Sequence, residues 1–276
     1  MKYRITILCE NSVGPISGTI AEHGFSALVE WQEGALLWDT GQGFTLLHNA
    51  QRMNKNLHNL QYVAISHGHY DHSGGLLPLL RTCGKKTVFA HPEIFTPRYR
   101  CKDTGDSISL GIPYPREYLE GQGAMFNLSD QFREILPGIH LSGQVKRSND
   151  FELGDSGLYL DTTKTVSDPF NDDQSLILET DKGLLLLLGC CHAGLINTLE
   201  HIKDKTGERN FYAILGGTHL GFCTATQLEQ TVALLKKYKI TKLAVSHCTG
   251  FTASARLLRE FPAAFQLAQV GYCLEA

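Results

Sequence analysis

The chain has 276 residues, and its 42% hydrophobic content is enough for a sizeable core. Its formal net charge is only -3, and no long run of like charges supports binding to nucleic acid or to a membrane surface. The longest apolar run, residues 184–188, is too short to span a bilayer, and the first residues do not resemble a signal peptide, so we expect a cytoplasmic protein.

The first part of the chain alternates apolar runs with turns that contain glycine or proline. Strands are expected at residues 4–8, 26–31, 35–38 and 62–65, and a helix at 74–80 and a strand at 88–90 follow. This order predicts a sheet meander that leads into the loop after residue 65.

From residue 97 to about 146, prolines and glycines are frequent and few apolar positions repeat. Loops of this length in compact domains are more often functional than idle. We therefore expect one domain over residues 1–276, with a lid-like insertion at about 97–146.

The second part restarts with a hairpin. Its expected elements are strands at 175–179 and 184–188, a helix at 195–203, a strand at 211–215, a helix at 226–238 and a strand at 242–245. Three of these strands are closely followed by a histidine, namely His192, His219 and His247.

Four potential metal ligands lie within six residues after the strand expected at 62–65. His67 and His69 are two apart on an extended segment, so both rings can point the same way, while Asp71 and His72 can face a second ion. Imidazole and carboxylate groups hold zinc or iron and leave room for a water molecule. We predict two divalent metal ions, with Zn2+ first and Fe, Mn or Mg as alternatives.

The isolated histidines are interpreted as surface or hydrogen-bonded residues: His23, His48, His58, His140 and His201.

The motif His67-x-His69-x-Asp71-His72 resembles the signature of the metallo-β-lactamase superfamily, and Trp38-Asp39-Thr40-Gly41 resembles its first motif. The resemblance implies an α/β fold, an αββα sandwich of two mixed β-sheets with outer helices. It also implies that Asp39 supports the site from behind the ligands, and we count Asp71 and Asp39 as catalytic residues.

Further motifs are similar to those of the superfamily branch that contains the dihydropterin ribofuranosyl-aminobenzene phosphate synthases. These are Glu22-His23-Gly24-Phe25-Ser26, Ala90-His91-Pro92, Asp172-Asp173-Gln174-Ser175, Gly189-Cys190-Cys191-His192-Ala193-Gly194, Gly216-Gly217-Thr218-His219-Leu220 and Ser246-His247-Cys248-Thr249-Gly250.

Superfamily members usually complete the site with a histidine before a hairpin, an aspartate at its end and a histidine on the last strand. This chain departs from that pattern, because Asp173 precedes its hairpin and His192 follows it. The resemblance implies that His192 and His247 are ligands. Two alternatives remain for the rest: Asp173 and His192 take the third and bridging positions, or His192 is the third ligand and His219 approaches the second metal.

The chain also offers side chains for a small anionic substrate. Arginine binds phosphate or carboxylate through two parallel hydrogen bonds, and we predict that Arg98 and Arg147 bind the substrate with His91 nearby. Cys190 and Cys191 adjoin the expected site, but a cysteine at the end of a strand is commonly a buried apolar residue. Ligation by either thiol is therefore the less favoured interpretation.

The leading function is metal-dependent hydrolysis, in which a metal-bound hydroxide attacks a phosphoester, pyrophosphate or acyl centre. One alternative, implied by the resemblance, is a transferase that displaces diphosphate from a pterin diphosphate. The other is a non-catalytic metal and thiol sensor that uses Cys190, Cys191, Cys223 and Cys248. Oligomeric state stays open, with a homo-oligomer compatible with the sequence.

Overall fold

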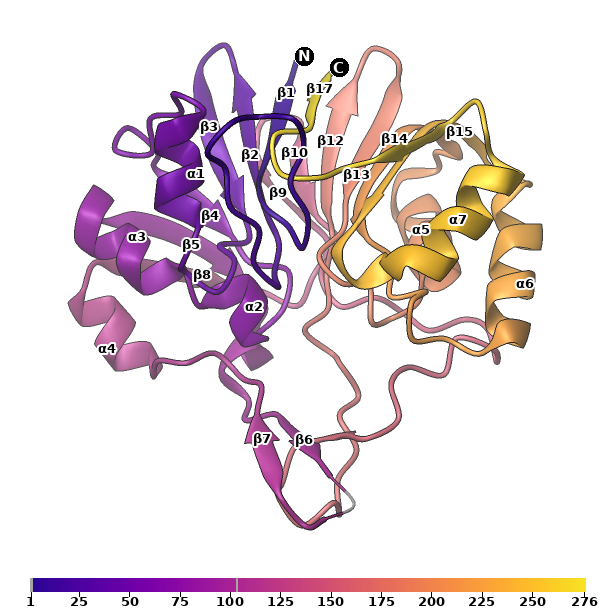
Figure 1. Cartoon of the computed structure of the whole chain (residues 1–276), viewed down its shortest axis with the longest axis horizontal. Helices are drawn as coiled ribbons and strands as arrows, with labels where there is room; N and C mark the ends of the chain where they lie inside the picture. Colours follow the sequence, from indigo (N-terminus) through magenta and orange to yellow (C-terminus); the bar gives the residue numbers. More distant parts are fainter. Residues whose placement is uncertain (1, 103) are drawn as a thin grey trace.

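The computed structural model describes residues 2–102 and 104–276, and two mixed β-sheets form the centre of the fold (Figure 1). The first sheet has seven strands, in the order β17 (Cys273–Glu275), β1 (Arg4–Cys9), β2 (Ser26–Trp31), β3 (Gly34–Trp38), β4 (Tyr62–Ala64), β5 (Lys86–Ala90) and β8 (Ala124–Leu128). Strands β17 to β3 pair antiparallel, and β3 to β8 pair parallel. The sheet is therefore mixed, because hairpins give way to crossovers after β3.

The second sheet also has seven strands. Their order is β16 (Phe265–Leu267), β15 (Lys239–Ser246), β14 (Asn210–Gly217), β13 (Gly183–Leu187), β12 (Leu176–Thr180), β10 (Ile139–Leu141) and β9 (Arg133–Leu136). Strands β13 to β16 pair parallel, and the remaining pairs are antiparallel.

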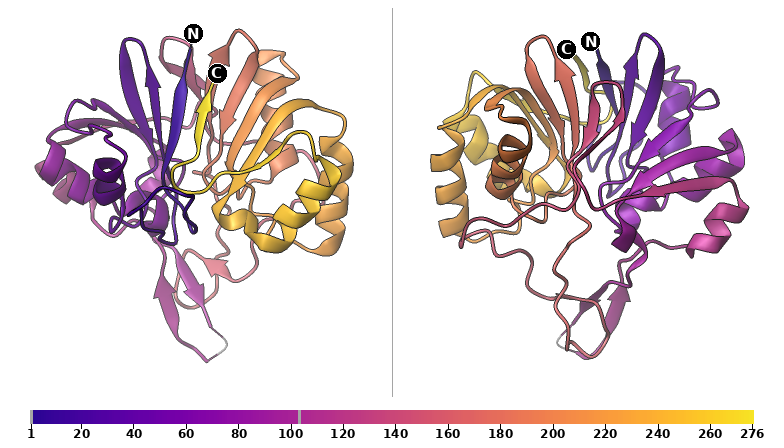
Figure 2. Two further views of the ribbon diagram at one scale, coloured as in Figure 1. Left: turned by 45° about the horizontal axis from the view of Figure 1, so that its top comes forward. Right: turned by 180° about the vertical axis from the view of Figure 1, so that it is seen from behind.

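Helices cover the outer faces of both sheets (Figures 1 and 2). The first half of the chain contributes α1 (Leu46–Arg52), α2 (Tyr70–Ser73), α3 (Leu76–Cys83), the 3-10 turn η1 (Pro92–Phe95) and α4 (Arg116–Gly121). The second half contributes α5 (Leu195–Thr206), α6 (Ala225–Leu235), the 3-10 turn η2 (His247–Thr249) and α7 (Gly250–Glu260). Within the described ranges, a membrane-crossing helix is absent, since no helix has the length and apolar character for one.

Alternation along the strands separates the apolar side chains into layers. Leu36 and Trp38 lie in the core between the two sheets, while Leu37 packs with the helices outside the first sheet. In the second sheet Leu185 faces the central core and Leu186 faces the outer helices. The αββα sandwich expected from the resemblance is confirmed.

A small third sheet leaves the sandwich, and we call it the flap. It consists of β11 (Leu158–Tyr159), β6 (Tyr99–Cys101) and β7 (Ser107–Ser109), and its outer end extends away from both main sheets (Figures 1 and 2). The insertion expected at about 97–146 is therefore smaller and differently built. Strands β8, β9 and β10 of that segment belong to the main sheets, and β11 comes from beyond it. Strands of two or three residues are too short to show an apolar period. The sequence pattern therefore did not predict β6, β7 and β11 as strands.

Candidate metal centre

The ends of five strands deliver the predicted site residues to one edge of the sandwich. Asp39 follows β3, and the loop with His67 follows β4. In the second sheet His192, His219 and His247 follow β13, β14 and β15. Because carboxyl ends of neighbouring parallel strands meet at one sheet edge, residues far apart in the sequence come together there.

The backbone at this edge adopts an uncommon conformation. Seven non-glycine residues in the described ranges have a positive φ, and four of them belong to this edge: Asp39, Cys191, His219 and His247. Side chains with a Cβ rarely adopt these angles, and such strain, roughly 1 to 3 kcal/mol for a residue, gathers at functional sites. The fold therefore maintains strained turns where the site residues lie.

Three buried imidazoles, His67, His69 and His192, form a histidine triad. Nε2 of His67 lies 3.0 Å from Nδ1 of His69, and the His192 ring centroid lies 4.8 and 4.9 Å from those of His67 and His69. One ring nitrogen from each residue lies within 4.8 Å of the other two. Burial, followed by the charge of neighbouring histidines, lowers the pKa of all three rings. The rings are therefore neutral at pH 7, and neutral imidazole is the form that binds a cation.

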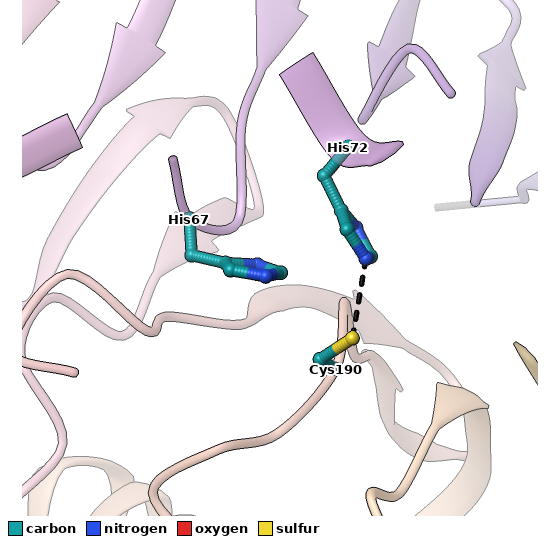
Figure 3. A group of neighbouring side chains, drawn as sticks. All are labelled: His67, His72 and Cys190. Carbon is teal, nitrogen blue, oxygen red and sulfur yellow. Dashed lines mark hydrogen bonds between the residues drawn. The ribbon is translucent and has the colours of Figure 1, made fainter. Parts of the chain in front are cut away.

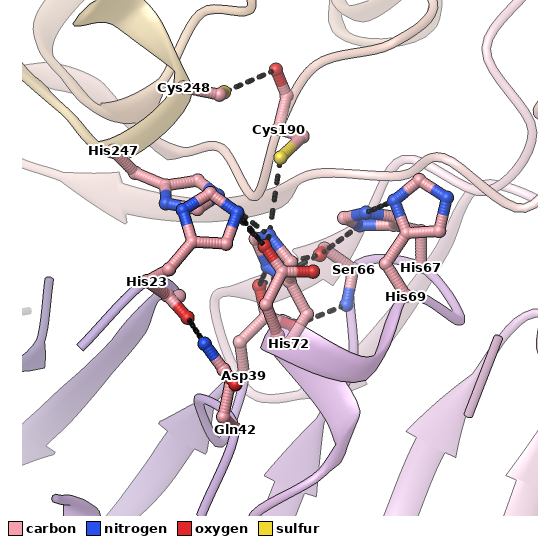
Figure 4. Close-up of polar contacts among 12 residues, drawn as sticks. His23, Asp39, Gln42, Ser66, His67, His69, His72, Cys190, His247 and Cys248 are labelled. Atoms are coloured by element: carbon pink, nitrogen blue, oxygen red, sulfur yellow. Dashed lines mark hydrogen bonds and ion pairs between the residues drawn. The ribbon is translucent and has the colours of Figure 1, made fainter. Parts of the chain in front are cut away.

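Asp71, His72, His247 and His23 form a second group beside the triad (Figure 4 shows the three histidines). Oδ2 of Asp71 lies 3.2 Å from Nε2 of His23 and 3.4 Å from Nε2 of His247. Nε2 of His72 lies 3.2 Å from Nε2 of His247. Burial would raise the pKa of Asp71, but the charge of His72 and hydrogen bonds from His23 and His247 hold it well below its usual range. A carboxylate among ring nitrogens is a suitable ligand set for a divalent cation.

The Cys190 thiol lies between the two groups. Its Sγ is 3.2 Å from Nε2 of His72, and it forms candidate ligand sets with His67 and His72, with His192 and His219, and with His247 and Cys248. Figure 3 shows Cys190 facing the rings of His67 and His72 from an opposite segment. Burial raises the pKa of this thiol well above its usual value, so a bound cation would be needed to hold it as a thiolate. Cys190 is buried as expected, but it faces ring nitrogens rather than an apolar core.

The ring orientations fit a metal ion. An oxygen outside the group holds Nδ1 of three rings: Asp39 holds His72 at 2.7 Å, Asp155 holds His192 at 2.9 Å, and Asn11 holds His247 at 2.8 Å. Such contacts fix the orientation of ligating histidines and leave Nε2 for the metal. Nε2 of His69 and Nε2 of His192 are buried without a hydrogen-bond partner. Since a buried polar atom without a partner is costly, a cation at these nitrogens would remove that cost.

Asp39 lies behind the candidate ligands, where the resemblance places it. Its Oδ1 accepts a hydrogen bond from the Ser66 amide at 2.7 Å, and its Oδ2 accepts bonds from Ser66 Oγ and His72 Nδ1, each at 2.7 Å. Burial lowers the pKa of His72, but the charges of Asp39 and Asp71 outweigh it and raise that pKa to about 9. A cation at Nε2 would compete with this proton.

The two alternative ligands occupy different places. Oδ2 of Asp173 accepts the amide hydrogen of Ala193 at 2.8 Å, and its Oδ1 is buried without a partner. Asp173 joins no candidate ligand set within residues 2–102 and 104–276, whereas His219 joins one with Cys190 and His192. The geometry favours the arrangement with His192 as the third ligand, and ligation itself stays a prediction.

Arg98 is buried and supports the loop that carries His67 and His69, the predicted metal loop. Its Nε lies 2.7 Å from Oδ2 of Asp168, and its Nη2 lies 2.7 Å from Oδ1 of Asp172. Oδ2 of Asp172 accepts the amide hydrogen of Gly68, between the first two histidines, at 2.7 Å. The guanidinium is therefore paired inside the protein.

Arg147 and His91 are also engaged within the protein. The Arg147 guanidinium donates to backbone oxygens that include those of His192 and Ala193, so it braces the loop that carries His192. Nδ1 of His91 accepts the amide hydrogen of Glu93 at the start of η1. Neither residue lines the cavity beside the metal centre, and contact with substrate stays a prediction for both and for Arg98.

Some residues of the candidate metal centre are not predicted from the sequence. His23 is one of the histidines interpreted as isolated, yet its ring lies beside Asp71. The motif Glu22-His23-Gly24-Phe25-Ser26 was the only sequence feature that pointed to a role in the site. Asp155 and Asn11 hold the rings of the candidate ligands His192 and His247 from 37 and 236 residues away in the sequence, so neither residue has a local sequence signal. Their roles emerge only when the strands bring these segments together.

A cavity of about 320 Å³ lies between the candidate ligands and the flap. Candidate ligands and supporting groups form one part of its wall: His23, His69, Asp71, Cys190, His192, His219, His247 and Cys248. Flap and loop residues form the rest: Tyr70, Arg100, Ile108, Leu110, Leu158 and Phe222. A small molecule could therefore reach the metal centre and the flap together.

An αββα sandwich with histidine, aspartate and cysteine side chains gathered at the sheet edge defines a metal-binding class of protein. The profile of the metallo-beta-lactamase superfamily matches residues 20–157. An uncharacterised protein of Methanocaldococcus jannaschii is 33% identical over 257 residues, which cover 92% of this chain and 93% of that protein. The chain belongs to the metallo-β-lactamase superfamily.

Two other similar proteins carry functional descriptions. The 7,8-dihydropterin-6-methyl-4-(beta-D-ribofuranosyl)-aminobenzene-5'-phosphate synthase of Methanocaldococcus jannaschii is 29% identical over 278 residues, 97% of this chain and 95% of that protein. A crystal structure described as a metal-dependent hydrolase of the beta-lactamase superfamily has a TM-score of 0.85 and 28% identity, and the match covers 99% of both chains. The Zn2+-bound PqqB from Methylobacterium extorquens shares the fold, with a TM-score of 0.56, 15% identity, and coverage of 98% and 99%.

Proposed function

We propose that this protein is a metal-dependent hydrolase that acts on a phosphoester or pyrophosphate group of a small anionic substrate. The observation that carries the proposal is the convergence of ring nitrogens, the Asp71 carboxylate and the Cys190 thiol at one cavity. Membership of the superfamily supports it. An acyl centre, the third group considered from the sequence, is the less favoured target because a cationic side chain lines the cavity.

Two divalent ions, Zn2+ first, fit the side chains present. The triad of His67, His69 and His192 would hold one ion. Asp71, His72 and His247, whose ligand atoms lie 3.2 to 3.8 Å apart, would hold the other, with Cys190 between the two groups. When bound, such ions lower the pKa of a water molecule and neutralise charge that develops on the attacked group.

The chain supplies orientation and a candidate proton donor. Asp39, Asp155 and Asn11 hold the ligand rings in fixed orientations, so little reorganisation is needed when the substrate reacts. His23 is half exposed at the cavity, with Nε2 beside Asp71. It is placed to donate a proton to the leaving group.

Metal analysis combined with a hydrolysis assay tests the proposal. The purified protein is expected to contain transition metal and to release phosphate from aromatic phosphoesters, and chelation should abolish this activity. His192→Ala is expected to lose metal and at least about 100-fold of the activity, since even residues behind a ligand typically contribute 10- to 100-fold. The matched control is His58→Ala, at an exposed histidine. Native protein without transition metal and with full activity after chelation would rule the mechanism out.

Group transfer is the second candidate, favoured by the 29% identity with the synthase over almost the whole chain. It would use the same cavity, with a carbon or nitrogen nucleophile in place of water. Incubation with a pterin diphosphate and an aminobenzene ribofuranosyl phosphate discriminates the two reactions. Transfer joins the pterin to the second compound and releases diphosphate, whereas hydrolysis releases only the pterin alcohol and diphosphate.

A further inference from the structure

The flap presents one row of side chains to the cavity. Arg100 on β6 pairs directly with Ile108 on β7 and with Leu158 on β11. Directly paired residues of antiparallel strands lie on the same face of a sheet. All three residues line the cavity, together with Leu110, which is two residues beyond Ile108 and so shares its face. The flap therefore places a cation between apolar side chains opposite the metal centre.

Arg100 is the one arginine or lysine among the residues that line this cavity. Its guanidinium makes no hydrogen bond or ion pair with any residue that the structure describes. The buried Arg98, two residues earlier, instead pairs through Nε with Asp168 and through Nη2 with Asp172. Since an arginine fork binds phosphate through two hydrogen bonds, Arg100 is available for an anionic group of a ligand.

The base of the flap is fixed to the metal loop, so Arg100 has a defined place. The amide of Tyr70 donates to the Leu110 carbonyl at 2.9 Å, and the amide of Leu110 donates to the Arg98 carbonyl at 2.8 Å. His69 and Gly111 also form an isolated β-bridge. The strand that carries Arg100 thus begins at a segment hydrogen-bonded to the ligand loop.

An aromatic side chain borders the same cavity from the second half of the molecule. Phe222 follows β14 and is 61% exposed, and its ring centroid lies 5.0 Å from that of His219. With Ile108 and Leu158 it gives the cavity apolar surface that could cover a flat ring of a ligand.

We propose that Arg100, Ile108, Leu158 and Phe222 form the substrate-recognition surface and select a phosphate group attached to an aromatic ring. This inference rests on the proposed function, because it assigns the recognition part of the same site. Arg100 holds the phosphate, while the apolar row and Phe222 cover the ring. It thereby narrows the proposed substrate class from small phosphoesters and pyrophosphates to aryl phosphates.

Binding of phenylphosphonate to the metal-loaded protein, measured by calorimetry, tests the inference without turnover. Arg100→Ile is expected to weaken binding about tenfold with unchanged metal content, since a charge-assisted hydrogen bond is lost. Arg259→Met is the control, at an exposed arginine on α7. The double variant Arg100→Ile with Ile108→Arg returns the cation to the neighbouring position on the same face and should recover most of the affinity.

Phe222→Ala should weaken phenylphosphonate but leave methylphosphonate, which lacks the ring, unchanged. Unaltered phenylphosphonate affinity in Arg100→Ile, no measurable binding by the wild type, or tighter binding of benzoate than of phenylphosphonate would overturn the inference. The proposed function fails separately, if the metal-loaded wild type binds phenylphosphonate through Arg100 but hydrolyses no phosphoester.

Discussion

The Cys190 thiol lies 3.2 Å from Nε2 of His72, although 118 residues separate them in the sequence. The contact joins the two halves of the sandwich, because His72 follows β4 of the first sheet and Cys190 follows β13 of the second. The contact thereby places a sulfur atom among candidate nitrogen and carboxylate ligands. A soft thiolate beside imidazole favours zinc or iron over magnesium.

Replacement of this thiol should reduce metal content. We expect Cys190→Ala to lose part of the bound metal and at least about tenfold of the activity, because the atom between the two ligand groups is removed. Inductively coupled plasma mass spectrometry measures the loss. Cys191→Ala is the neighbouring control, since the Cys191 thiol contacts Thr198 instead of a ligand. Equal metal content in both variants would show that Cys190 does not bind the ions.

Asp39→Asn should weaken metal binding without removing a predicted ligand. Both Asp39 oxygens accept hydrogen bonds, and the amide group would present hydrogens to Ser66 or His72 in place of one acceptor. A loss of about 10- to 100-fold in zinc affinity is expected for such a supporting residue. Competition with a fluorescent chelator measures it. An unchanged zinc affinity would contradict the support assigned to this carboxylate.

Stability of the metal-free protein should fall on both sides of pH 6.5. Burial, with neighbouring histidines, lowers the pKa values of His67, His69 and His192 below the ordinary 6.5, so the unfolded chain binds more protons and stability falls as the pH drops below 6.5. Burial lowers the pKa of both His72 and His219, but Asp39 and Asp71 outweigh it and raise the pKa of His72 to about 9. Asp155 and the Cys248 thiol likewise raise the pKa of His219 to about 10. The contribution of these two protonated rings to the free energy of unfolding is fully present below pH 6.5, and it is lost as the pH rises through 9 to 10.

Urea unfolding at pH 5.5, 6.5 and 9 with and without chelator measures this dependence. In the metal-loaded protein the alkaline loss should be smaller, because a cation at Nε2 of His72 replaces the titrating proton. Equal midpoints at pH 6.5 and 9 in the metal-free protein would contradict the expected alkaline loss.

Arg98→Met should unfold more easily than the wild type. It leaves two buried carboxylates, Asp168 and Asp172, without their cation, and breaking a buried ion pair typically costs about 3 to 5 kcal/mol. Denaturant unfolding measures the cost, with Arg259→Met as a surface control that should change stability by less than about 0.5 kcal/mol. Wild-type stability together with a raised KM would instead support the substrate contact predicted for Arg98.

Local apolar patterns were sufficient for most of the sandwich. The strand Ser26–Trp31 has the bounds expected from its sequence, and the strands that precede His192, His219 and His247 are all present. Each has several apolar residues in succession, which is the signal that burial in a sheet produces. The loop with four candidate ligands was equally clear, because these residues lie within six positions of the sequence.

Contacts between distant segments could not be predicted in this way. Arg98 resembles any lone arginine in the sequence, since its partners Asp168 and Asp172 lie 70 and 74 residues further on. Strand β17 pairs with β1 although they lie at opposite ends of the chain. Cys190 was expected to be a buried apolar residue. A cysteine at the end of a strand is compatible with either burial or metal binding, so the sequence does not distinguish the two.

The hydrogen bond from the Tyr70 amide to Leu110 joins the flap to a residue that lies between His69 and Asp71. An ion bound by His69 and Asp71 and a molecule bound by the flap would therefore both affect the conformation of the same backbone segment. Thermodynamic linkage makes such effects reciprocal: whatever factor the ion adds to the affinity for the molecule, the molecule adds to the retention of the ion. A compound that fits the flap would thus protect the protein against chelation, whereas a compound that reaches only the ions would compete with the chelator for them.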